Sequence, residues 1–156
     1  MAEVLIRAEL DRVGLADRVS VESAGTGDWH LGQPMDRRAR AELVRRGYDG
    51  SAHRARQIAP DWLGRFDLLL AMDADNLWSL RQMAGVGRGT ADQDDIAARI
   101  RLLREFDPAA PDGAEVPDPY GGSPEEFAAV AEIIQAAARG LASALAELLG
   151  ERAAGT

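Results

Sequence analysis

A short loop in the C-terminal half of the chain carries the residues best suited to chemistry. Residues 116–122 read Val-Pro-Asp-Pro-Tyr-Gly-Gly, so Asp118 stands between two prolines. Pro117 and Pro119 fix their own φ angles, and Pro119 biases Asp118 toward an extended backbone. The carboxyl group is therefore held in one direction, as a residue that transfers a proton to a leaving group must be. This arrangement suits a general acid at Asp118.

Tyr120 and the two glycines that follow give this loop a second property. The Tyr120 ring could lie against an aromatic substrate, and Gly121 and Gly122 let the chain turn sharply. The same residues also fit a turn that leads into a helix and has no catalytic role. By itself the loop leaves both interpretations open.

The segments around the loop alternate between helix and strand patterns, which predicts a parallel sheet with helices on both faces. The expected helices are residues 1–14, residues 35–46, a helix capped by Asp73 and a long helix that begins after Ser123. The expected strands are residues 19–23, 66–72 and 99–103, and residues 84–95 are expected to form a loop.

The long C-terminal helix has the clearest signals. Ser123 and Glu126 predict a capping box, and Pro124 fits the first helical position. Apolar residues then recur every three or four positions, which predicts a face packed on the core. This face comprises Phe127, Val130, Ile134, Ala137, Leu141, Leu145 and Leu148.

Length and composition predict one domain over residues 1–156, with an apolar content of 46% that suffices for a buried core. The net charge of −8 argues against nucleic acid or an anionic membrane as a partner, since both attract basic surfaces. No uninterrupted apolar run approaches the roughly 18 residues of a membrane span, so a cytoplasmic protein is expected. With no cysteine and two isolated histidines, neither a metal site nor any other cofactor is expected.

Four segments, in this order and spacing, resemble the low-molecular-weight protein tyrosine phosphatases. They are the loop at 116–122, residues 20–30 (Ser-Val-Glu-Ser-Ala-Gly-Thr-Gly-Asp-Trp-His), residues 47–58 (Gly-Tyr-Asp-Gly-Ser-Ala-His-Arg-Ala-Arg-Gln-Ile) and residues 66–73 (Phe-Asp-Leu-Leu-Leu-Ala-Met-Asp). The resemblance covers nearly the whole chain. It implies a three-layer α/β sandwich with a small parallel sheet, and hydrolysis of a phosphotyrosine protein or an aryl phosphate through a phosphocysteine. A tyrosine kinase would be the counterpart.

The resemblance also implies roles for matching positions. Asp118 is expected to protonate the leaving phenolate and then to activate the water that hydrolyses phosphocysteine. Trp29 and Tyr120 match the aromatic walls of the substrate cleft, and Ser23 and His53 match residues that brace the phosphate-binding loop. Each also has an ordinary interpretation, with His53 as a structural histidine and Trp29 as a cover over core at a loop corner.

The nucleophile motif of the family, a cysteine followed by five residues and an arginine, is absent from these 156 residues. In the family it follows a first β-strand, and in many members it continues into Met-Ala-Glu, the tripeptide with which this sequence opens. Either the true start lies upstream or the chain is a truncated product, and we favour the first, in which the upstream codons encode that strand and loop. Without them, we expect the chain to be inactive, because the surviving members of a catalytic unit do not replace the lost ones.

In the four-stranded sheet of the family, the missing first strand lies at the centre, between the strands that match residues 19–23 and 66–72. Its absence predicts a separation of about 10 Å between them, twice the usual strand spacing. Unpaired backbone groups would face this gap. We therefore expect the chain to be poorly stable by itself, unless another chain or a rearrangement fills the gap.

Other functions on the same scaffold stay open. A non-catalytic relative would bind a partner protein through the remaining surface. A protein arginine phosphatase would differ partly within the missing loop. An arsenate reductase is disfavoured, because such enzymes use additional cysteines and the chain has none.

Overall fold

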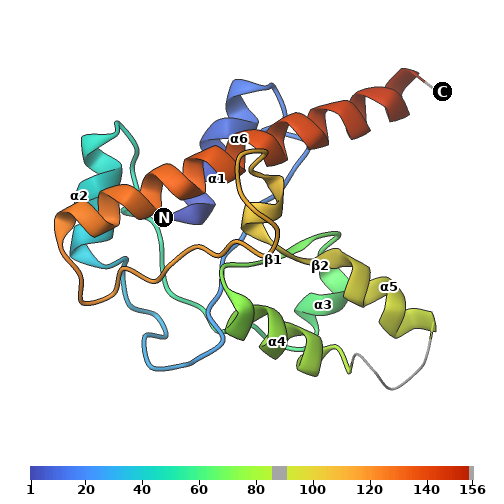
Figure 1. Ribbon diagram of the computed structural model, residues 1–156, viewed down its shortest axis with the longest axis horizontal. Coiled ribbons are helices and arrows are strands. Elements are labelled where there is room, and N and C mark those ends of the chain that lie inside the picture. Colours follow the sequence, from blue (N-terminus) through green and yellow to red (C-terminus); the bar gives the residue numbers. More distant parts are fainter. Residues whose placement is uncertain (86–90, 155–156) are drawn as a thin grey trace.

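The computed structural model describes residues 1–85 and 91–154, the side chains of 91–93 and 151–154 excepted. Figure 1 shows the elements along the chain. In order they are α1 (Ala2–Arg12), α2 (Arg37–Arg45), α3 (Trp62–Arg65), β1 (Leu69–Ala71), α4 (Ala74–Met83), α5 (Ala91–Arg99), β2 (Ile100–Leu102), the 3-10 helix η1 (Leu103–Phe106) and α6 (Pro124–Ala154).

The sheet consists of β1 and β2, which pair in parallel with Leu69 opposite Ile100 and Ala71 opposite Leu102. These four side chains are buried in one apolar cluster, which Leu63 of α3 and Leu80 of α4 complete. The intervening side chain of Leu70 packs on the opposite cluster, which α1 and α6 form. Successive strand residues thus point to opposite faces. Helices cover both faces, which confirms the predicted α/β sandwich with a small parallel sheet (Figure 1).

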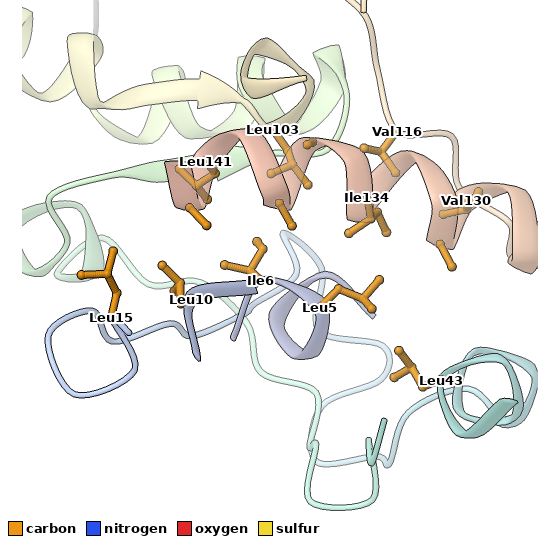
Figure 2. Close-up of a cluster of buried hydrophobic side chains, with 14 residues drawn as sticks. Leu5, Ile6, Leu10, Leu15, Leu43, Leu103, Val116, Val130, Ile134 and Leu141 are labelled. Carbon is orange, nitrogen blue, oxygen red and sulfur yellow. The ribbon is translucent and has the colours of Figure 1, made fainter. Parts of the chain in front are cut away.

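The main core lies between α1 and α6. Leu5, Ile6 and Leu10 of α1 point toward the buried face of α6 (Figure 2). The predicted apolar stripe of α6 is confirmed over most of its length, but Leu148 is 48% exposed. The buried residues of α6 are Phe127, Val130, Ala131, Ile134, Ala137, Ala138, Leu141 and Ala142.

By length and composition, Pro124–Gly150 is the one helix within the described ranges that could cross a membrane. This helix lacks the uninterrupted apolar run sought in the sequence, because polar residues such as Glu132 and Arg139 interrupt it. One face of this helix packs in the core against α1 and η1, and core helices satisfy the same criterion.

The predicted helix caps are present. The Ser123 amide donates to the Glu126 carboxylate at 2.7 Å, and the Glu126 amide donates to the Ser123 hydroxyl at 3.4 Å. Asp73 caps α4 by accepting from the Asn76 amide at 2.7 Å. Local sequence therefore fixes where these two helices start.

Two predictions about the elements are wrong. Residues 19–23 do not form a strand, because no neighbouring strand in the described part of the chain pairs with them; nearby, a single parallel bridge joins Gly25 to Gln57. Residues 91–95 belong to α5 rather than to a loop, and residues 86–90 of that predicted loop lie outside the described residues. The predicted strands at 66–72 and 99–103 are confirmed, each shortened to three residues.

Candidate active site

Three of the residues singled out in the sequence line one cavity of about 350 Å³. They are Ser23, Trp29 and His53, which come from two loops far apart in the chain. Backbone hydrogen bonds hold these loops together, since the Gly25 amide donates to the Arg56 carbonyl and the Gly32 amide donates to the Ala55 carbonyl, both at 2.8 Å. The rest of the lining comprises Ala24, Gly25, Thr26, Gly27, His30, Leu31, Ala55, Arg56 and Asn76.

Trp29 forms an exposed aromatic wall of this cavity. Its side chain is 76% exposed, and its ring lies directly over Gly27. A Cβ atom at Gly27 would stand 2.3 Å from the indole, so the ring can take this position only above a glycine. Trp29 therefore does not cover core, contrary to the ordinary interpretation of this residue, and its face is open to a ligand.

Ser23 and His53 meet at Glu3, in the first turn of α1. The Ser23 hydroxyl donates to the Glu3 carboxylate, and His53 Nδ1 lies 3.8 Å from a Glu3 oxygen. Arg7 binds the other Glu3 oxygen at 2.9 Å. Burial lowers the pKa of His53, so the neutral ring is favoured near pH 7. The two predicted bracing residues thus hold the start of α1.

The loop of Asp118 is anchored at both ends. At its start, the Val116 amide donates to the Met72 carbonyl at 2.7 Å, just beyond β1, and the Val116 side chain is buried. At its end, Arg38 donates to the Gly122 carbonyl at 2.9 Å. Between these anchors the Tyr120 amide donates to the Asp118 carboxylate at 3.0 Å. Asp118 and Tyr120 are exposed and lie on a fixed loop.

A contact between aromatic rings joins this loop to the cavity. The Tyr120 ring lies 5.9 Å from the ring of His30, which lines the cavity. Asp118 and Tyr120 are not part of the lining itself. The structure thus brings Ser23, Trp29 and His53 to one cavity and places the Asp118 loop at its rim.

Two residues of this site were missed in the sequence, Glu3 and His30. An acidic residue in the first turn of a helix is ordinary, so nothing marked Glu3 as the partner of Ser23 and His53. His30 follows Trp29 directly in the sequence, and that proximity was the one available signal. Arg56 also lines the cavity, and it binds Glu22 at 2.8 Å.

The site presents aromatic surfaces, a carboxyl group on a rigid loop and a neutral histidine beside a hydroxyl. Such a set can hold an aromatic ring and move a proton. It contains no thiol, since the chain has no cysteine. Within the described residues, no group of three acidic or histidine side chains could hold a metal ion.

Comparisons with known proteins agree with one another. The family profile of the low molecular weight phosphotyrosine protein phosphatases matches residues 1–151. A low molecular weight protein-tyrosine-phosphatase of Streptomyces coelicolor is 43% identical over 155 residues, which are 99% of this chain and 90% of the relative. Low molecular weight protein-tyrosine phosphatase A of Mycobacterium tuberculosis is 42% identical over 90% of this chain and 80% of its own.

Solved structures show the same likeness. The crystal structure of YfkJ from Bacillus subtilis superposes with a TM-score of 0.80 at 32% identity, over 94% of this chain and 85% of the other. A protein tyrosine phosphatase from Entamoeba histolytica superposes with a TM-score of 0.82 at 28% identity, over 94% of this chain and 87% of the other.

Proposed function

The chain belongs to the low molecular weight phosphotyrosine protein phosphatase family, and we propose that its cavity and Asp118 loop form the acid and substrate-binding parts of a phosphotyrosine phosphatase site. One observation carries the proposal. The cavity that Ser23, Trp29 and His53 line has the Asp118 loop at its rim, although these residues come from three separate segments.

Each side chain has a role in the proposed reaction. Trp29 and Tyr120 flank the aromatic ring of the substrate. Asp118 donates its proton to the phenolate as the bond between phosphorus and oxygen breaks, and the resulting carboxylate then takes a proton from water. Ser23 and His53 hold the start of α1 through Glu3. This keeps the amino end of that helix, whose free amides favour anions, beside the cavity.

The attacking group must be a thiolate from polypeptide other than these 156 residues, because they contain no cysteine. In the family chemistry the thiolate bonds to phosphorus, the phenol leaves with the proton of Asp118, and water then releases inorganic phosphate. We therefore expect the 156 residues alone to leave aryl phosphates intact. Proposed substrates are phosphotyrosine proteins, with a tyrosine kinase as counterpart and a cytoplasmic location.

The test compares two proteins in an assay of p-nitrophenyl phosphate and phenyl phosphate hydrolysis. One is the 156-residue chain, and the other carries in addition an N-terminal apolar strand followed by the cysteine and arginine loop. We expect turnover from the extended chain alone. Hydrolysis at a comparable rate by the 156 residues would overturn this account of the chemistry.

Replacing Asp118 in the extended chain tests the proton donor. Asp118→Asn should lower kcat by about 10² to 10⁴, with the larger loss on phenyl phosphate because its leaving group needs the proton more. Asp112→Asn is the matched control, since Asp112 is an exposed aspartate of the neighbouring loop outside the site. An unchanged kcat for Asp118→Asn would refute the proposed role of this residue.

The missing cysteine also favours a second candidate, a non-catalytic protein that binds phosphotyrosine peptides at the same cavity. In that case the extended chain would bind a phosphotyrosine peptide without releasing phosphate. Hydrolysis of phosphoarginine in preference to phosphotyrosine would instead assign the extended chain to the arginine phosphatases.

A further inference from the structure

The guanidinium group of Arg38, in the first turn of α2, contacts three separate parts of the fold. Its Nε and Nη2 atoms donate to the two carboxylate oxygens of Asp36, at 3.2 and 3.0 Å. Its Nη1 atom donates to the carbonyl of Gly122, at 2.9 Å. Its Cζ atom stands 4.9 Å from the centre of the Phe127 ring, near the start of α6. Because α2 and the start of α6 lie side by side (Figure 1), Arg38 joins both helices to the end of the Asp118 loop.

Two of these partners fix the direction in which Arg38 donates to the loop. Asp36 is the cap of α2 and also accepts from the amides of Arg38 and Ala39, at 2.8 and 3.4 Å, so the helix holds its carboxylate. Phe127 is 3% exposed, so its ring is held by the packing of α6. A planar guanidinium that contacts two such fixed groups presents its remaining N–H groups in a set direction. One of these groups meets the Gly122 carbonyl.

Residues 117–122 have few other contacts of this kind. Among the described residues, Arg38 makes the one hydrogen bond from another element to this segment. The other hydrogen bonds of the segment are local. The Gly122 amide donates to the carbonyl three residues earlier at 2.8 Å, and the Tyr120 amide donates to the Asp118 carboxylate at 3.0 Å. These bonds make the segment one compact turn, so a group that fixes Gly122 also fixes the carboxyl group of Asp118.

The glycines and prolines of the loop explain why such a bond matters. Gly121 has a φ angle of +80°, which glycine adopts readily, and neither Gly121 nor Gly122 has a side chain that could pack on a neighbour. Both prolines lack an amide hydrogen and cannot donate to another element. The bond from Arg38 to Gly122 is therefore the contact best placed to keep the loop at the rim of the cavity.

We propose that Arg38 is a positioning residue, which holds the Asp118 loop so that the carboxyl group faces the oxygen of the leaving phenolate. The position of a proton donor decides its effect, because a displacement of about 1 Å can lower a rate about 10²-fold. This inference rests on the proposed function, in which Asp118 protonates that oxygen. That Arg38 holds the loop in place does not rest on it.

Two substrates with different leaving groups separate positioning from a purely structural role. The quantity measured in the extended chain is kcat/KM, which covers the steps up to release of the phenol. Arg38→Ala should lower it about 10-fold to 100-fold for phenyl phosphate, but less than about threefold for p-nitrophenyl phosphate, whose leaving group needs the proton less. Arg37→Ala is the matched control, since Arg37 is the exposed neighbour of Arg38 in α2, and it should change neither value. Equal losses on both substrates in Arg38→Ala would overturn the proposal.

A second comparison removes the proton donor first. In an Asp118→Asn background the loop has no proton to deliver, so adding Arg38→Ala should lower kcat/KM for phenyl phosphate by less than about threefold more. The full loss of the single variant in this background would refute positioning of Asp118. Arg38→Lys covers the case in which Arg38→Ala fails to fold, because lysine keeps the charge but lacks the planar fork. Its ratio of kcat/KM for phenyl phosphate to that for p-nitrophenyl phosphate should also fall, and an unchanged ratio would refute the proposal.

NMR spectra of the extended chain test the hold on the loop without turnover. The rings of Tyr120 and His30, whose centres lie 5.9 Å apart, should show a nuclear Overhauser effect between them. Arg38→Ala should abolish it and Arg37→Ala should preserve it, whereas an undiminished effect in Arg38→Ala would overturn the proposal. Its loss in an extended chain that hydrolyses no aryl phosphate would support the hold on the loop and refute the phosphatase function. The two failures are therefore distinguishable.

Discussion

Replacing Gly140 by alanine tests the packing of α6 on η1. A Cβ atom at Gly140 would stand 1.7 Å from the carbonyl oxygen of Phe106, whereas real Cβ atoms essentially never approach within 3.0 Å. The oxygen belongs to the backbone and cannot rotate away, so α6 and η1 must separate by more than about 1 Å. Such a gap forfeits a quarter to a half of the attraction between facing atoms. The fully buried Leu103 of η1 lies in this contact region.

The expected loss can be estimated from two opposing effects. Overpacking of this kind costs about 3 kcal/mol, and the higher helix propensity of alanine regains about 1 kcal/mol. We therefore expect Gly140→Ala to lower the free energy of unfolding by about 2 kcal/mol. For a chain of this length, that corresponds to a fall in Tm of about 6 °C.

The assay is urea unfolding followed by far-ultraviolet circular dichroism. Gly150→Ala is the matched control, because Gly150 lies in the same helix and a Cβ there would meet no atom within 4 Å. It should raise the free energy of unfolding by up to about 1 kcal/mol. If Gly140→Ala proves as stable as Gly150→Ala, with the same dependence on urea, the close approach of α6 to η1 is refuted.

Two further predictions concern stability in acid and the aromatic wall. Hydrogen bonds from Arg45 and Arg46 hold the pKa of the buried Glu42 at about 2, below its usual 4.5. The stabilisation by the ionised Glu42 is therefore complete above pH 4.5 and is lost as the pH falls toward 2. The urea midpoint of the unsubstituted chain should drop over this window, and that of Glu42→Gln should drop by less. Identical pH profiles of the two proteins would contradict the prediction. Gly27→Ala should shift the NMR signal of the Trp29 indole with little loss of stability, because a Cβ atom at Gly27 would stand 2.3 Å from the ring. Gly64→Ala is the control and should leave that signal unchanged. An unchanged signal in both variants would contradict the position of Trp29 over Gly27.

The helices α1, α2, α4 and α6 were predictable because their signals are local, whereas α3 was not expected and α5 was expected as part of a loop. Asp73 and the pair Ser123 and Glu126 mark helix starts within four residues of sequence, and both caps are present. The apolar periodicity of α6 likewise identified its buried face. For strands the sequence was less informative. Residues 19–23 have a strand pattern, but a strand forms only beside another strand, and none in the described part of the chain pairs with this segment.

The sequence also determined the family, since four separated segments match it in order and a family profile covers residues 1–151. The residues of the loop at 116–122 suggested Asp118 and Tyr120 as candidate site residues, and the resemblance to the family added Trp29, Ser23 and His53. Their surroundings came from the fold alone: Glu3 lies between Ser23 and His53, and His30 contacts Tyr120. These are contacts between segments far apart in the chain. No local pattern encodes such distances, because they depend on how the helices pack around the sheet.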